Sequence, residues 1–141
     1  MANDCIFCKI VNGELPAERL YDDDRIIAIL DIYPANKGHV LVIPKKHYET
    51  FDKVPEEELY ATISIVKRFV QSVITALHAE GVNVHVNSGP AAGPLVKHTH
   101  IHIIPRFKDD GLSGLSLTYD AKKYETGELK DYATKIKRAM K

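Results

Sequence analysis

The sequence predicts an α+β protein in which an antiparallel sheet of about five strands packs with one long helix and one or two shorter ones. The prediction rests on the order of the elements, because strand-like segments flank a single long amphipathic stretch and do not alternate regularly with helices. The two strand-like segments after that stretch are joined by a short loop, so we expect them to pair antiparallel.

Four segments carry strand patterns. Residues 25–30 form a nearly unbroken apolar run, and residues 39–43 form a second one, which Pro44 should end because proline cannot donate to a ladder. Valine alternates with polar residues over 82–86, a pattern typical of a half-exposed strand. A loop of small residues over 88–94 then leads into a histidine-rich segment, the fourth expected strand.

Three segments carry helical patterns. Residues 5–11 are expected to form a short helical turn that ends near Gly13. A long helix is expected over about 55–80, because apolar residues recur there in steps of three and four and Gly81 suits a helix stop. Its expected apolar stripe consists of Leu59, Ile63, Val66, Val70, Val73 and Leu77. A last helix is expected over about 128–140.

The composition indicates one globular domain over 1–141. The chain carries 19 basic and 19 acidic residues, so no overall field draws it to nucleic acid or to a membrane surface. Neither a signal peptide nor an apolar run long enough to span a bilayer is visible. A cytoplasmic location is therefore expected, where a permanent disulfide between the two cysteines is not.

The most informative segment is 98–102, which reads His-Thr-His-Ile-His. Side chains alternate between the two faces of a strand, so the three imidazoles are expected to share one face. Imidazole titrates near neutral pH and serves as nucleophile, acid, base or metal ligand. A polar strand face without chemistry is the alternative interpretation. In the preceding loop, Gly89 and Gly93 would let backbone N–H groups approach an anion, although an ordinary turn is the simpler explanation.

Cys5 and Cys8 form a Cys-x-x-Cys pair, which is typical of either a redox site or a metal site. The redox interpretation requires a βαβ context that the sequence does not show. A structural zinc ion requires four nitrogen or sulfur ligands, so two histidines would have to join the pair. Two buried free thiols in a short helix are the remaining alternative.

The chain as a whole resembles the histidine triad (HIT) family. The resemblance rests on motifs in matching order and spacing over about 4–107: CIFCKI, LDI, GHVLVIPKKH, NSG, and AAG followed by VKHTHIHIIPRF. It implies a single HIT domain with a HIT-like fold, in which residues 108–141 form a C-terminal extension with a helix. It also implies a homodimer with a sheet that continues across the interface.

The resemblance further implies a nucleotide-binding hydrolase or transferase that acts at the α-phosphorus of nucleoside phosphoramidates or dinucleoside polyphosphates. His100 resembles the nucleophile that forms a phosphohistidine, His102 a phosphate contact, and His39 a histidine buried behind the nucleophile. With His98, these make the expected catalytic set. The expected contacts to a purine nucleotide are Asp31 (ribose), Asn87 and Gly93 (phosphate), His102, and Phe7, Ile10 and Ile29 (base pocket), although the three apolar residues fit a plain core equally well.

The resemblance completes the zinc site with histidines. Some HIT proteins, and the related galactose-1-phosphate uridylyltransferases, are similar to this chain in having two cysteines and two such histidines. The implied ligands of a structural zinc ion are Cys5, Cys8, His47 and His98. His98 would then not be free to act as an acid.

The chain departs from the family pattern at Pro94 and Leu95, where polar residues usually contact the phosphate or the leaving group. Two alternatives to a phosphohistidine enzyme stay open, and the second of them is motivated by this departure. One is a zinc-dependent hydrolase with His98, His100 and His102 as metal ligands. The other is a nucleotide-binding module with little catalysis.

Overall fold

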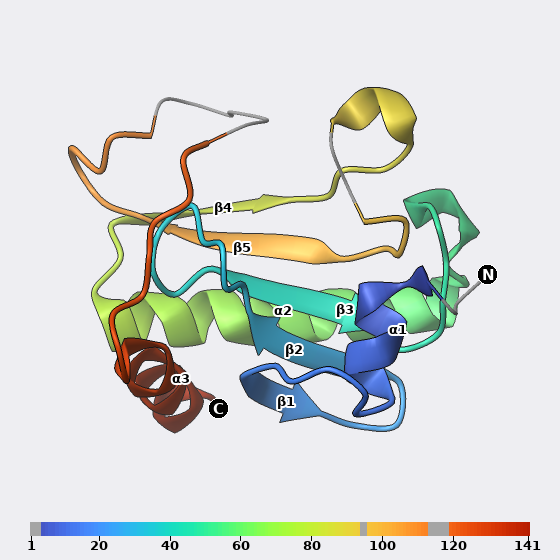
Figure 1. Cartoon of the computed structure of the whole chain (residues 1–141), viewed down its shortest axis with the longest axis horizontal. Helices are drawn as coiled ribbons and strands as arrows, with labels where there is room; N and C mark the ends of the chain where they lie inside the picture. Colours follow the sequence, from blue (N-terminus) through green and yellow to red (C-terminus); the bar gives the residue numbers. More distant parts are fainter. Residues whose placement is uncertain (1–3, 94–95, 113–118) are drawn as a thin grey trace.

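A five-stranded antiparallel sheet in the order β1-β2-β3-β5-β4 forms the centre of the molecule (Figure 1). The computed structural model describes residues 4–93, 96–112 and 119–141. Its strands are β1 (Arg19–Asp22), β2 (Ile26–Leu30), β3 (Val40–Pro44), β4 (Gly81–His85) and β5 (Ile101–Arg106). Its helices are α1 (Ile6–Val11), α2 (Glu56–Leu77) and α3 (Glu128–Ala139), with short 3-10 turns η2 (Phe51–Lys53) and η3 (Pro90–Ala92). The predicted α+β class with five antiparallel strands is confirmed.

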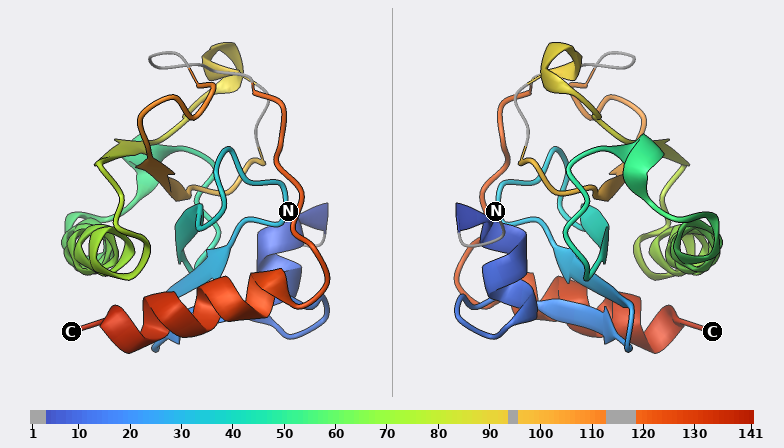
Figure 2. Two further views of the ribbon diagram at one scale, coloured as in Figure 1. Left: turned by 90° about the vertical axis from the view of Figure 1, so that its left-hand side faces the viewer. Right: turned by 90° about the vertical axis from the view of Figure 1, so that its right-hand side faces the viewer.

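The two faces of the sheet carry separate apolar clusters. On one face, α2 and α3 cover a core that includes Phe69, Ile101, Ile103 and Ile136. On the opposite face, α1 covers a smaller cluster that includes Phe7. Figure 2 shows α2 and α1 on opposite sides of the sheet. The second face is the one that builds the candidate site, because His102 of β5 points there while Ile101 and Ile103 of the same strand fill the larger core.

Helix α2 differs from the prediction in phase and in length. Its buried residues are Thr62, Ile65, Val66, Phe69, Ser72 and Val73, so only two members of the expected stripe are buried. Ile63 is 45% exposed, because the helix has apolar residues on a second flank that the sequence pattern alone does not distinguish from the core side. The helix ends at Leu77, where His78 adopts a left-handed conformation, and Glu80 N–H already donates to Arg106 O in the sheet.

Three strand predictions also need correction. Strand β1 was not predicted, because it is four residues long and buries only Leu20. Pro44 does not stop β3 but is its last residue, opposite Ile26. Strand β5 begins only at Ile101, so the two earlier triad histidines belong to the segment that enters the strand. The predicted last helix is confirmed, and its buried residues are Ala133 and Ile136.

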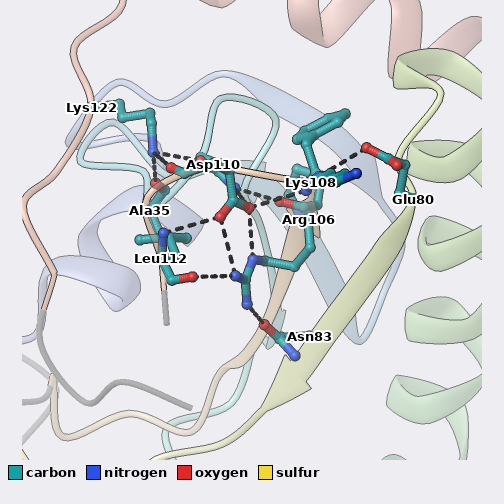
Figure 3. Close-up of polar contacts among 11 residues, drawn as sticks. Ala35, Glu80, Asn83, Arg106, Lys108, Asp110, Leu112 and Lys122 are labelled. Carbon is teal, nitrogen blue, oxygen red and sulfur yellow. Dashed lines mark hydrogen bonds and ion pairs between the residues drawn. The ribbon is translucent and has the colours of Figure 1, made fainter. Parts of the chain in front are cut away.

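The turn at 34–38 is fastened to the C-terminal part of the chain (Figure 3). Lys122 Nζ donates to Ala35 O at 2.9 Å and to Asn36 Oδ1 at 2.5 Å. The amide of Asn36 donates to Asp110 Oδ2 at 2.9 Å, and the same carboxylate accepts from Arg106 Nε at 2.8 Å. The turn that leads into β3 is thus held by β5 and by the extension together.

Gly38 is required in this turn. Its φ of +97° lies in a region that side chains rarely adopt, and a Cβ atom there would collide with the Leu77 side chain. We expect Gly38→Ala to lower the free energy of unfolding by about 2 kcal/mol or more in denaturant titration. Gly13 has a φ of +80° and open space around it, so Gly13→Ala should lower the free energy of unfolding by only about 1 kcal/mol. Equal losses would contradict the steric argument.

Candidate active site

A cavity of about 520 Å³ lies between α1, the end of β2 and three histidines, which are His85 of β4, His100 just before β5 and His102 of β5. Its lining includes seven residues expected from the sequence: Phe7, Ile10, Ile29, Asp31, Asn87, His100 and His102. Gly93 does not line it, and Pro94 and Leu95 lie outside the described residues. One side of the cavity is therefore apolar and the other carries ionisable groups, which is the usual make-up of a small-molecule site.

His100 presents an unprotonated nitrogen. Its Nδ1 lies 2.7 Å from the backbone oxygen of His98. A carbonyl only accepts, so Nδ1 carries the proton and Nε2 keeps its lone pair. Burial lowers the pKa of His100 below its ordinary value, which keeps the ring neutral at pH 7. The edge of the ring packs against Phe7 at a centroid distance of 4.9 Å, which restrains its orientation.

His102 presents the opposite kind of group, a hydrogen-bond donor. The backbone N–H of Ala35 donates to His39 Nδ1 at 3.1 Å, so the proton of the neutral His39 ring is on Nε2. That Nε2 lies 2.9 Å from Nδ1 of His102, which accepts and leaves the His102 proton on its own Nε2. Among the described residues, His102 Nε2 is buried without a hydrogen-bond partner. It can therefore donate to a ligand in the cavity.

The hydrogen-bonded pair of His39 and His102 is neutral. Burial, reinforced by the neighbouring imidazoles, lowers the pKa of His39 to about 3 and that of His102 to about 2. His39 lines no part of the cavity and contacts it only through His102. Its role in this arrangement is to fix the tautomer and the ring plane of His102.

Asp31 lies directly after β2, at the rim of the cavity. Its backbone N–H donates to His39 O, and its Oδ1 accepts from the backbone N–H of Tyr33, both at 2.9 Å. Oδ2 lies 3.8 Å from His39 Nε2, but this is not an ion pair because His39 is neutral. Burial raises the pKa of Asp31 above its ordinary value, an effect that the Tyr33 N–H opposes.

His98 faces away from the cavity and joins the two cysteines. Its Nε2 donates to Pro44 O at 2.7 Å, which leaves the lone pair of Nδ1 free. That Nδ1 lies 3.2 Å from Cys5 Sγ and 3.5 Å from Cys8 Sγ. The Nδ1 of His47 lies 3.4 Å from Cys8 Sγ. The structure thus brings all four predicted metal ligands together.

The four ligand atoms fit a tetrahedral metal ion. They all lie within 4.8 Å of one another, and they include two thiols and two imidazole nitrogens. The hydrogen bond to Pro44 O fixes the ligating nitrogen of His98, as carbonyls commonly do behind metal-bound histidines. Burial and the neighbouring Cys5 raise the pKa of Cys8 to about 11, so this thiol needs a cation beside it to ionise at pH 7.

The three triad histidines do not form a metal-binding group of their own among the described residues. The second grouping of metal-ligating atoms joins Asp31, His39 and His102, and the hydrogen bond between the two imidazoles already explains their closeness. His98 and His100 therefore serve different sites, although they are two residues apart.

Among the lining residues that were not expected from the sequence, His85 and Tyr119 bear most on the chemistry of the cavity. His85 in β4 lines it and stacks on His102, whereas the valine alternation indicated only a solvated strand face. Register was the missing information, because His85 stands opposite His102 across the β4–β5 pair. Tyr119 comes from the C-terminal extension, and its pKa is raised to about 12 by burial and by Asp31. No motif around Tyr119 in the sequence points to the cavity.

Residues 12–109 match the model of the HIT domain. The chain belongs to the HIT family. It is 53% identical over 107 residues to an uncharacterised HIT-like protein of Methanocaldococcus jannaschii, covering 76% of this chain and 82% of that protein. It is 45% identical over 112 residues to adenylylsulfatase HINT3 of Arabidopsis thaliana, covering 79% of this chain but only 57% of that longer protein.

A solved structure has the same fold. The zinc-bound histidine triad family protein of Mycobacterium smegmatis superposes with a TM-score of 0.83 at 32% identity, covering 99% of this chain and 94% of that one. The HIT match contains the triad, Asp31, His39 and His47, whereas Cys5 and Cys8 precede it. None of the helices in the described residues has the length and apolar character needed to cross a bilayer.

Proposed function

We propose that this HIT protein is a nucleotide hydrolase or transferase that forms a covalent intermediate on His100. One observation carries the proposal: a neutral imidazole with a free Nε2 lines a cavity beside a second imidazole that offers an N–H. A nucleophile next to a donor for the developing charge is the pair that phosphoryl and nucleotidyl transfer require.

The reaction has two displacement steps. In the first, the lone pair of His100 Nε2 attacks the α-phosphorus, and the bond to the leaving group breaks with its electron pair going to that group. In the second, water attacks the same phosphorus, and the electron pair of the P–N bond returns to Nε2. Throughout, His102 Nε2–H donates to a non-bridging oxygen, where it stabilises negative charge without moving.

The nucleoside is expected to lie across the cavity from α1 to the end of β2. Phe7, Ile10 and Ile29 offer apolar surface to a purine base, and the cavity is within the usual size range of small-molecule sites. The Asp31 carboxylate can accept from ribose hydroxyls. We assign the side-chain amide of Asn87 to a contact with the phosphate. Gly93 has no cavity contact and receives no role here.

Nucleoside phosphoramidates and dinucleoside polyphosphates are the proposed substrate classes, because each offers an α-phosphorus with a separable leaving group. Adenylylsulfatase, the activity named for the HINT3 relative, also requires release of an adenylyl group, which supports this choice. A reducing, cytoplasmic setting suits the proposal, since both cysteines are free thiols and are proposed below to bind a metal.

We expect His100→Ala to abolish turnover of an adenosine phosphoramidate, by about 10⁴-fold or more, because the variant lacks the nitrogen that forms the bond to phosphorus. Binding of AMP should survive within about tenfold by calorimetry, since the donor on His102 and the apolar wall stay in place. Intact-protein mass spectrometry should detect an acid-labile adenylyl adduct on the wild type and none on the variant. Full activity of the variant would overturn the assignment.

We also propose that Cys5, Cys8, His47 and His98 hold a structural zinc ion. It would tie the start of α1 to the segment that enters β5, and so stabilise the wall of the cavity behind His100. Two independent observations support this zinc site. The four ligand atoms lie close together, and the histidine triad family protein of M. smegmatis is described as zinc-bound.

Cys8→Ser should lower zinc affinity by more than about 100-fold and lower the melting temperature, because one thiolate ligand is lost. Metal content is measured by elemental analysis and melting by calorimetry, with and without a chelator. His78→Asn serves as control, because it removes an exposed imidazole outside the cluster and asparagine tolerates the left-handed backbone there. The zinc site would be refuted by a wild type that purifies and refolds without zinc and whose melting temperature is the same with and without a chelator.

The remaining partner proposal is a homodimer built on the edge of the sheet. Strand β4 is an edge strand, and its Val84 is 48% exposed. Val84 stands opposite the buried Ile103, so it points to the side of the sheet that α2 covers. The exposed flank of α2 adds Tyr60, Ile63 and Ile74. An unpaired edge beside exposed apolar residues, on a chain without net charge, favours pairing with a second copy.

Val84→Lys should convert a dimer to a monomer in light scattering, because each interface would receive two charges without a partner. Leu15→Lys, at an exposed apolar residue between α1 and β1, is the control and should leave the mass unchanged. A monomeric wild type, or a dimer that survives the Val84 change, would refute this interface.

A further inference from the structure

A third imidazole lines the cavity, from the neighbouring strand. His85 of β4 is the antiparallel partner of His102 in β5, so the two side chains lie on the same face of the sheet. Their rings stack with centroids 4.4 Å apart and an interplanar angle of 10°. His85 also lines the cavity together with His100. Register and stacking therefore hold this ring at the edge of the space where the phosphorus is expected.

His85 differs from the other imidazoles around the cavity because its side chain makes no hydrogen bond among the described residues. His39, His98 and His100 each make a short hydrogen bond to a backbone group. By contrast, Nδ1 of His85 is buried and has no hydrogen-bond partner among the described residues. A buried polar atom without a partner is rare in proteins, and a catalytic role is one of its recognised explanations.

The charge state of His85 suits a proton acceptor. Burial lowers its pKa below the ordinary value, so the ring is neutral at pH 7 and has a lone pair. Its stacking partner His102 is neutral as well, with a pKa of about 2. The other ionisable groups that line the cavity are Asp31, Tyr33, Tyr119 and His100.

The other two imidazoles in the cavity cannot accept a proton during the second displacement step. Once the intermediate has formed, His100 is bonded to phosphorus through Nε2 and donates to His98 O through Nδ1. His102 accepts from His39 on Nδ1 and carries its own proton on Nε2. The carboxylate of Asp31 also lies within 4.8 Å of an imidazole nitrogen of His102, but this side chain is assigned to the ribose hydroxyls.

We propose that His85 is a further catalytic residue, the general base for the water that hydrolyses the nucleotidyl–His100 intermediate. This inference rests on the proposed function. The water oxygen forms a bond to phosphorus, the P–Nε2 bond breaks, and its electron pair returns to His100. The water proton passes to the free nitrogen of His85, which releases it to solvent when the monophosphate leaves. No oxidant, reductant or co-reactant is consumed.

The decisive variant is His85→Phe, which keeps a flat ring on His102 but has no proton acceptor. In rapid-quench experiments with an adenosine phosphoramidate, we expect the adenylyl adduct to form within about threefold of the wild-type rate. Hydrolysis of the adduct should slow about 100-fold or more, the usual effect of losing a general base. The adduct should therefore accumulate and be measured by intact-protein mass spectrometry. His78→Asn should behave as wild type.

A second variant covers the case in which phenylalanine disturbs the sheet. His85→Ala leaves a gap beside His102, and free imidazole added to this variant should restore hydrolysis of the adduct in a concentration-dependent way. Hydrolysis at the wild-type rate in His85→Phe would overturn the proposal. An equal loss in both steps without imidazole rescue would also overturn it, because His85 would then only pack on His102. If the wild type itself forms no adduct, the proposed function fails instead.

Discussion

The buried hydrogen bond between His39 and His102 is the interaction on which the candidate site depends. It joins the residue just before β3 to a residue of β5. It requires that both rings are neutral and that His39 carries its proton on Nε2. The backbone N–H of Ala35 occupies Nδ1 of His39 and so places the His39 proton on Nε2. That proton occupies Nδ1 of His102, which leaves the His102 proton on its own Nε2. A protonated ring here would be a charge buried without a carboxylate partner at hydrogen-bond distance, which is costly at this depth.

Because the site depends on this hydrogen bond, it also depends on the contacts that hold the turn at 34–38. Gly38 donates its N–H to the Tyr124 hydroxyl at 2.8 Å, and Lys122 fastens the carbonyl of Ala35. Displacement of the turn would move the Ala35 N–H away from His39, and the tautomer of His102 would no longer be fixed. The C-terminal extension therefore acts on the site through one backbone donor, in addition to placing Tyr119 at the cavity.

The irregular entry into β5 lets neighbouring histidines serve two sites. In a regular strand, the rings at 98, 100 and 102 would share one direction. Because the strand begins only at Ile101, His98 instead directs its Nδ1 to the cysteines while its carbonyl accepts from His100. One residue thus contributes its side chain to the candidate metal site and its backbone to the orientation of the proposed nucleophile.

The sequence by itself determined which residue types are available and roughly where the elements lie. Four of the five strands, the final helix, the cysteine pair and the alternating histidines are all local patterns, and local patterns follow from backbone geometry. Only the tertiary structure decided the phase of α2, since Ile63 and Val66 are equally apolar and differ only in what packs on them. The same holds for His85 and Tyr119, because strand register and the path of the extension bring them to the cavity. Both depend on contacts between residues far apart in the chain, and a local pattern does not encode such contacts.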